Sequence, residues 1–131
     1  MPFVRIDALR ADRVRLDGLG RAVHEALIDA IGIPVDDLFQ VLTSHDGTSG
    51  MFRYDPRYLG VHRDDGVVYI DITMGAGRSS EQKKSLYAKI AELAGKYAGT
   101  EPGNVFITVH ENQFADWSFG NGIGQYLEGN Q

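Results

Sequence analysis

The first residues of the chain alternate between hydrophobic and polar side chains. Val4, Ile6 and Ala8 occupy every second position, with Arg5 and Asp7 between them. Successive side chains of a β-strand point to opposite faces, so this period of two predicts a half-buried strand over residues 3–9.

From residue 12 the hydrophobic period lengthens to three and four residues. The apolar positions of this segment are Leu16, Leu19, Val23, Leu27 and Ala30. Such spacing predicts one stripe of an amphipathic helix, which Gly32 and Pro34 end in the usual order. A second strand is expected over residues 38–45, followed by a connection over residues 46–65 that is rich in Gly, Asp, Ser and Arg.

The pattern then repeats. Alternation is seen again at Val68, Ile70, Ile72 and Met74, which predicts a third strand. The segment Ser79–Gln82 has the S-x-x-Q form of a capping box and predicts the start of a second helix, which ends at Gly99. A last strand is expected around residues 105–109, and the tail is expected to form turns or a short hairpin.

These elements predict an α+β fold of two consecutive β-α-β units in a single domain. The units cover residues 2–45 and 66–112, and a tail covers residues 113–131. The crossover within each unit makes its two strands parallel. Four strands are expected in one sheet with both helices on one face, which leaves the other face open for a partner. We expect that open face to be apolar, through Val68, Ile70 and Ile72 or through the residues that alternate with them.

Composition narrows the classes of function. A chain of 131 residues is the length of one domain, and its formal net charge of −5 argues against a nucleic-acid partner. The absence of cysteine excludes disulfides, thiol catalysis and Cys-ligated zinc. No apolar run reaches the roughly 18–20 residues of a membrane span, and the charged start does not fit a signal peptide. We therefore expect no membrane association and a cytoplasmic location.

Pro2 is the first candidate for chemistry. A small second residue permits removal of the initiator methionine, which would leave a free secondary amine. The ordinary pKa of an α-amino group is near 8, so such an amine can be neutral at physiological pH. Apolar surroundings and a nearby arginine would lower that pKa, whereas a closer carboxylate would raise it. A Met-Pro start also occurs in proteins that make no catalytic use of it.

Two charged residues are further candidates. Arg78 follows the glycine-rich segment 75–77, and its guanidinium could grip a carboxylate with two hydrogen bonds. It could equally be a surface arginine after a turn. Asp37 is expected at the start of the second strand, where it could orient a water or hold a proton, although aspartate is common in turns. The four histidines lack the spacing of a metal site, so no metal or organic cofactor is expected.

In combination, these features resemble the tautomerase superfamily, and within it the malonate semialdehyde decarboxylase group. The resemblance covers nearly the whole chain. Its most specific parts are Pro2, Gly32-Ile33-Pro34 with Asp37 and Phe39-Gln40, Gly77-Arg78 with Glu81-Gln82-Lys83, and Asp116-Trp117-Ser118-Phe119-Gly120.

The resemblance implies a role for particular residues. Pro2 corresponds to the catalytic amino-terminal proline, and Asp37 to an aspartate that positions or activates water. Arg78 corresponds to one of two substrate-binding arginines, while Ala76 stands where the second is found. That departure weakens the decarboxylase assignment more than the superfamily assignment. The residues matching a hydrophobic pocket lining are Trp117, Phe119 and Tyr126.

The resemblance also implies a tautomerase/MIF-like subunit that assembles as a homotrimer with the sheets facing inward. The expected activity is cofactor-independent tautomerisation of a small 2-keto or enol carboxylate by Pro2. One alternative is a malonate semialdehyde-type 3-oxoacid decarboxylase or hydratase. Another is a non-enzymatic interaction protein on the same fold, because a fold does not determine a function.

Overall fold

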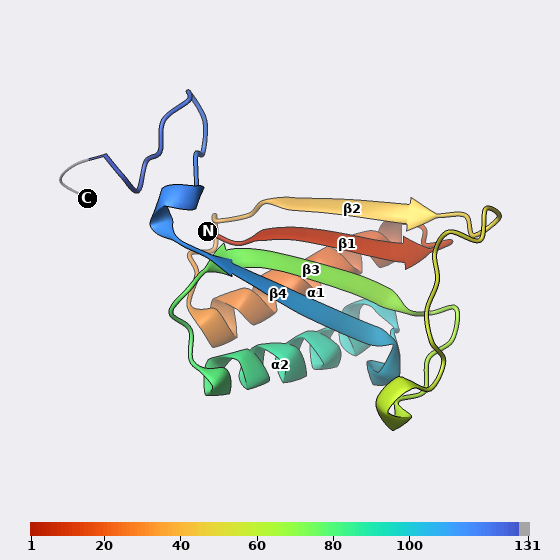
Figure 1. The fold of residues 1–131 in the computed structure, drawn as a ribbon. Coiled ribbons are helices and arrows are strands. Elements are labelled where there is room, and N and C mark those ends of the chain that lie inside the picture. Colours follow the sequence, from red (N-terminus) through yellow and green to blue (C-terminus); the bar gives the residue numbers. More distant parts are fainter. Residues whose placement is uncertain (129–131) are drawn as a thin grey trace.

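A computed structural model describes residues 1–128 and contains the four strands and two long helices in the expected order (Figure 1). The elements are β1 (Phe3–Leu9), α1 (Arg13–Ile31), β2 (Gln40–His45), β3 (Val68–Gly75), α2 (Ser80–Ala98) and β4 (Val105–Asn112). Short 3-10 turns are found at η1 (Tyr58–Gly60), η2 (Pro102–Asn104) and η3 (Phe114–Asp116). The predicted fold class is confirmed. Of the predicted tail, the described residues 113–128 form turns and no hairpin.

The sheet has the strand order β2-β1-β3-β4. Strands β1 and β2 are parallel, as are β3 and β4, whereas the two central strands are antiparallel with Ile6 opposite Ile70. Both helices cover the same face of the sheet (Figure 1). With this topology the starts of β1 and β2 lie at the same end of the sheet as the ends of β3 and β4.

Side-chain caps and glycines set the helix boundaries that the sequence predicted. The carboxylate of Asp12 accepts a hydrogen bond from the backbone N–H of Arg15 at 2.8 Å at the start of α1. At the start of α2, Ser79 and Gln82 make both bonds of the capping box. Both helices end at a glycine in the left-handed conformation, where other residues are disfavoured.

The core lies between the sheet and the helices. The inward side chains of the two central strands are almost fully buried: Val4, Ile6, Ala8, Val68, Ile70 and Ile72. They pack against buried residues of both helices such as Leu19, Val23, Leu86 and Ile90. Burying a side chain of this size stabilises the fold by about 1.5–3 kcal/mol.

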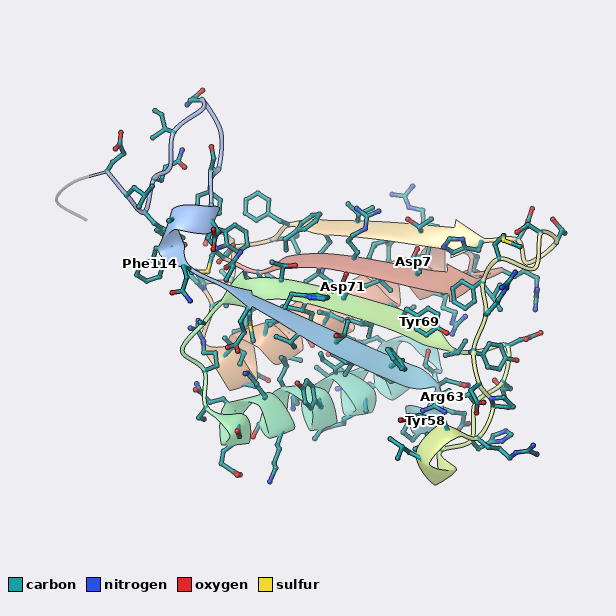
Figure 2. The ribbon with its side chains drawn as sticks, viewed as in Figure 1. Asp7, Tyr58, Arg63, Tyr69, Asp71 and Phe114 are labelled. Atoms are coloured by element: carbon teal, nitrogen blue, oxygen red, sulfur yellow. The ribbon has the colours of Figure 1, made fainter. Side chains whose placement is uncertain are left out.

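The open face of the sheet is mixed in character, so the prediction of an apolar face is wrong. Val68, Ile70 and Ile72 all point to the helices, and the residues alternating with them are Tyr69, Asp71 and Thr73. Figure 2 shows Asp7, Asp71 and Tyr69 on the strands of this sheet. At the end of this face where β3 begins, Phe52 stacks on Tyr69 and Tyr69 meets Phe106 edge-on.

Two aspartate–histidine pairs lie on this open face in equivalent places. His45 Nε2 lies 2.7 Å from Asp7 Oδ1, and His110 Nε2 lies 3.1 Å from Asp71 Oδ1. In both halves the aspartate stands opposite a threonine, and the histidine lies two positions further along the parallel partner strand. The two β-α-β units therefore repeat each other in side-chain placement as well as in topology.

Candidate active site

Strand register brings the candidate site residues to one end of the sheet. Phe3 pairs with Thr73 near the end of β3, and Val4 pairs with Gln40 at the start of β2. The last pair of the β3–β4 ladder is Gly75 with Asn112. As a result, the start of the chain lies beside the tail that follows β4, as Figure 1 shows.

Pro2 is buried in a cleft at this end of the sheet. The cleft has a volume of about 350 Å³. Its lining residues are Pro2, Phe3, Phe39, Gln40, Trp117, Ser118 and Phe119. Three of the residues predicted for the site, namely Pro2, Trp117 and Phe119, are thus brought together. Most of the lining is apolar, which favours neutral groups over charged ones.

An aromatic stack forms one wall of the cleft. The rings of Trp117 and Phe119 are stacked with centroids 5.5 Å apart and planes 10° from parallel. Tyr126 does not line the cleft; it meets the ring of Phe119 edge-on at 5.2 Å, so it supports the wall from outside. Burial raises the pKa of the Tyr126 hydroxyl, and the negative charge of Asp37 raises it further. Tyr126 is therefore a neutral phenol at physiological pH.

Asp37 lies in a turn, three residues before β2 begins at Gln40. Its backbone N–H donates to the carbonyl of Pro34 at 3.1 Å and so is used in the turn. The predicted position at the start of the strand is therefore wrong. The Asp37 carboxylate forms an ion pair with the amino group of Met1, and both side chains are largely shielded from solvent.

Met1 is accommodated by the absence of a side chain on β3. A Cβ at Gly75 would lie 3.3 Å from Met1 Cε, so the methionine rests against the bare backbone there. In the chain with Met1 attached, the nitrogen of Pro2 is a tertiary amide and has no basic lone pair.

Arg78 lies in the turn between β3 and α2, one residue before the N-cap Ser79. The turn depends on Gly77, whose φ of 121° is unfavourable for a residue with a side chain. Arg78 is half-buried, does not line the cleft, and makes no hydrogen bond or ion pair with any of residues 1–128. Its guanidinium therefore has no partner among these residues, and it lies at the same end of the sheet as Pro2.

Residues 1–128 contain no cluster of three or more His, Asp or Glu side chains suited to a metal ion. Neither helix described there is both long and apolar enough to pass through a lipid bilayer.

Comparisons with known proteins show the family of the chain. A family model described as "Tautomerase enzyme" matches residues 37–120, and a second with the same description matches residues 2–57. The probable tautomerase YusQ of Bacillus subtilis (strain 168) is 44% identical over 98% of this chain and 100% of its own length. The chain belongs to the tautomerase family.

Two solved structures place this tautomerase near one branch of the superfamily. FG41 malonate semialdehyde decarboxylase inhibited by 3-bromopropiolate is 36% identical, with a TM-score of 0.87 over 95% of this chain and 94% of that one. A second malonate semialdehyde decarboxylase, described with both decarboxylase and hydratase activities, is 29% identical, with a TM-score of 0.86 over 95% of each chain. The protein is therefore an enzyme of the tautomerase superfamily, as the sequence predicted.

Four lining residues of this tautomerase were not predicted as site residues: Phe3, Phe39, Gln40 and Ser118. Phe39 and Gln40 carried part of the resemblance but had no assigned role. Gln40 also donates from Nε2 to the carbonyl of Gly20 at 2.9 Å, which ties the cleft to α1. For Phe3 there was a signal, because it is an aromatic side chain on the polar side of the first strand, next to Pro2.

Proposed function

We propose that this tautomerase acts without a cofactor and uses the amine of Pro2, freed by removal of Met1, to move a proton within a small 2-keto or enol carboxylate. The observation that carries the proposal is the burial of Pro2 in an apolar cleft beside Trp117 and Phe119. A secondary amine there would have a lone pair held in one direction by its ring. Shielding from water favours its neutral, basic form.

The proposed step needs only one proton carrier. In the enol-to-keto direction, the Pro2 nitrogen takes the proton of the enol hydroxyl. The oxygen lone pair becomes the carbonyl bond, and the carbon–carbon π electrons take the proton back from the Pro2 ammonium at the neighbouring carbon. The amine ends as it began, and the product is an isomer of the substrate.

Arg78 is the proposed partner of the substrate carboxylate. Its guanidinium has no other partner among the described residues, and it stands at the amino end of α2, where an anion is favoured. The remaining polar group of the substrate would face Pro2, while its apolar part would lie against Trp117 and Phe119.

Turnover of a panel of enol-pyruvates, with matched Pro2→Ala protein, tests this function. We expect the native protein to transfer the proton, which is detected as loss of the enol absorbance. The rate of this loss should decrease greatly in the Pro2→Ala variant. A protein with free Pro2 that isomerises no enol carboxylate would refute the proposal.

A second candidate is decarboxylation or hydration of a 3-oxoacid. It is favoured by the pairing of Asp37 with the amino group of Met1, because a carboxylate so close to the chain start would also favour a charged Pro2 amine. A Pro2 ammonium would polarise a carbonyl instead of abstracting a proton, and Asp37 could steer a water. Assays of 3-oxoacids and enol-pyruvates at several pH values separate the two candidates.

For the assembly we propose a homotrimer through the open face of the sheet, the arrangement that the family resemblance implies. One feature of that face supports a partner. Asp71 Oδ1 is inaccessible to solvent, and although His110 Nε2 lies 3.1 Å away, the pair does not have the geometry of a hydrogen bond and no other described residue donates to this oxygen. A donor from a second copy would satisfy it. The cytoplasmic location stays a prediction from the sequence.

A further inference from the structure

Asn112, the last residue of β4, contacts both segments that follow the strands at the cleft end. Its side-chain Oδ1 accepts a hydrogen bond from the indole Nε1–H of Trp117 at 2.8 Å. Its backbone carbonyl accepts one from the N–H of Ala76 at 2.8 Å. One residue is therefore bonded to the wall of the cleft and to the turn that carries Arg78.

The indole bond is a strong constraint on the wall. The indole N–H can only donate a hydrogen bond, and a partly buried donor needs an acceptor. Here that acceptor is Oδ1 of Asn112. The turn before Trp117 is fixed separately, because the Asp116 carboxylate accepts from the N–H of Gln113 at 2.8 Å. Asp116 thus shapes the backbone, whereas Asn112 sets the orientation of the ring.

The bond to Ala76 extends the constraint to the arginine. Only Gly77 separates Ala76 from Arg78, and the ladder of β3 and β4 ends at Gly75 and Asn112. Asn112 therefore closes the ladder at the point where the chain leaves for Arg78. We infer that Asn112 is a positioning residue, which holds the Trp117 indole against the Pro2 cleft in register with the Arg78 turn. Its effect on turnover rests on the proposed function; its hold on the indole does not.

The substitution that isolates the side-chain bond is Asn112→Leu, which is close in shape and keeps the backbone carbonyl. Trp117 is the single tryptophan of the chain, so one indole N–H resonance and one fluorophore report on the wall directly. We expect the indole resonance to move upfield, its N–H to exchange faster with water, and quenching of the fluorescence by acrylamide to increase. Asn112→Asp keeps an acceptor oxygen and should restore the protected indole.

Kinetics separate positioning from general damage. The wall contacts bound substrate in both the ground state and the transition state, so Asn112→Leu should raise KM with little change in kcat. We expect kcat/KM to fall by about tenfold, the equivalent of one lost hydrogen bond. In a Trp117→Phe background, which has no indole N–H, Asn112→Leu should have little further effect on kcat/KM.

The outcomes distinguish this inference from the proposed function. An Asn112→Leu protein that is folded by circular dichroism but keeps the native indole resonance and quenching would overturn the inference. So would an equal loss of kcat/KM in the Trp117→Phe background. If no enol or 3-oxo carboxylate is turned over by the native protein, the proposed function fails, while the indole measurements still decide the role of Asn112.

Discussion

Asp37 pairs through its carboxylate with the amino group of Met1, the residue directly before Pro2. In the unprocessed chain the methionine therefore occupies the carboxylate and also rests against Gly75. Removal of Met1 would release Asp37 and convert the Pro2 amide into an amine in the same event.

Retention of Met1 should abolish activity, because an amide nitrogen is not basic. Intact-mass measurement identifies the processed and unprocessed fractions, and each is assayed separately. Pro2→Ala, which offers a primary amine with a looser geometry, should lose about 10²-fold in kcat/KM or more, the usual contribution of a positioned acid–base group. Full activity with Met1 attached would show that another residue does the chemistry.

Asp37→Asn should lower the pKa of the Pro2 amine, because it removes the negative charge that favours the ammonium. We expect a decrease of about 1 unit or more. Titration of ¹⁵N-proline-labelled, processed protein by NMR measures it in both proteins. An identical Pro2 pKa in the two would mean that Asp37 does not face the amine after processing.

The same titration chooses between the candidate functions. A native value below the ordinary value of about 8 supports Pro2 as a base, and one above about 8.5 supports decarboxylation or hydration. The Tyr126 hydroxyl does not interfere, because burial raises its pKa above the usual value of 10. Tyr126→Phe should therefore leave the pH–rate profile unchanged below about pH 10.

Arg78→Ala should lose most activity on carboxylate substrates. Ala76 offers no second cation nearby, so the loss of a charge-assisted pair should cost on the order of 2–4 kcal/mol in kcat/KM. Arg13→Ala is the matched control. It removes the same charge from α1, where the Arg13 side chain is 93% exposed. Activity within about threefold of native in Arg78→Ala would show that another cation binds the substrate carboxylate.

Gly77→Ala should reduce both stability and activity. A Cβ there meets no atom within 4 Å, so the cost comes from the φ of 121° alone, about 1–2 kcal/mol in the free energy of unfolding. Gly50→Ala is matched, since Gly50 also has a positive φ and open space but lies in the connection. Chemical denaturation should show a loss in both variants, and kcat/KM should fall only in Gly77→Ala. Equal kinetics in the two would mean that the turn does not govern the place of Arg78.

Light scattering should return the mass of three chains for the native protein. Phe106→Lys places a charge on the open face, where Phe106 is 44% exposed, and should dissociate the assembly. Val14→Lys makes the same change on α1, where Val14 is 77% exposed, and should leave the trimer intact. A stable monomer at micromolar concentration would contradict the proposed assembly.

The elements could be predicted because their signals are local. Alternation at residues 4–8, the Ser79–Gln82 capping box and the glycines after both helices each act within a few residues of the chain. The joint placement of Pro2 and Trp117 was predicted through the resemblance rather than through the pattern.

The parts that could not be predicted depend on contacts between distant segments. Phe39 enters the cleft because β2 is parallel to β1 in the register that pairs Gln40 with Val4. Tyr126 lies behind Phe119 because the tail folds back at Gly120, which has a φ of 133°. The pattern of hydrophobic residues gives no sign of this turn. The mixed character of the open face was not predicted either. Alternation shows that Asp71 points outward, but it does not show whether the outward face is apolar or charged.

The matching aspartate–histidine pairs imply a near two-fold axis through the sheet between Ile6 and Ile70. The offset that carries Asp7 onto Asp71 carries Pro2 onto Gly66, which is in mid-chain and has an ordinary peptide nitrogen. The opposite end of the sheet is instead occupied by the connection with Tyr58 and Arg63 (Figure 2). A chain cut before Gly66 would have an amino group at the position that matches Pro2. The two halves, expressed as separate polypeptides, would then have an amine at each end of the sheet.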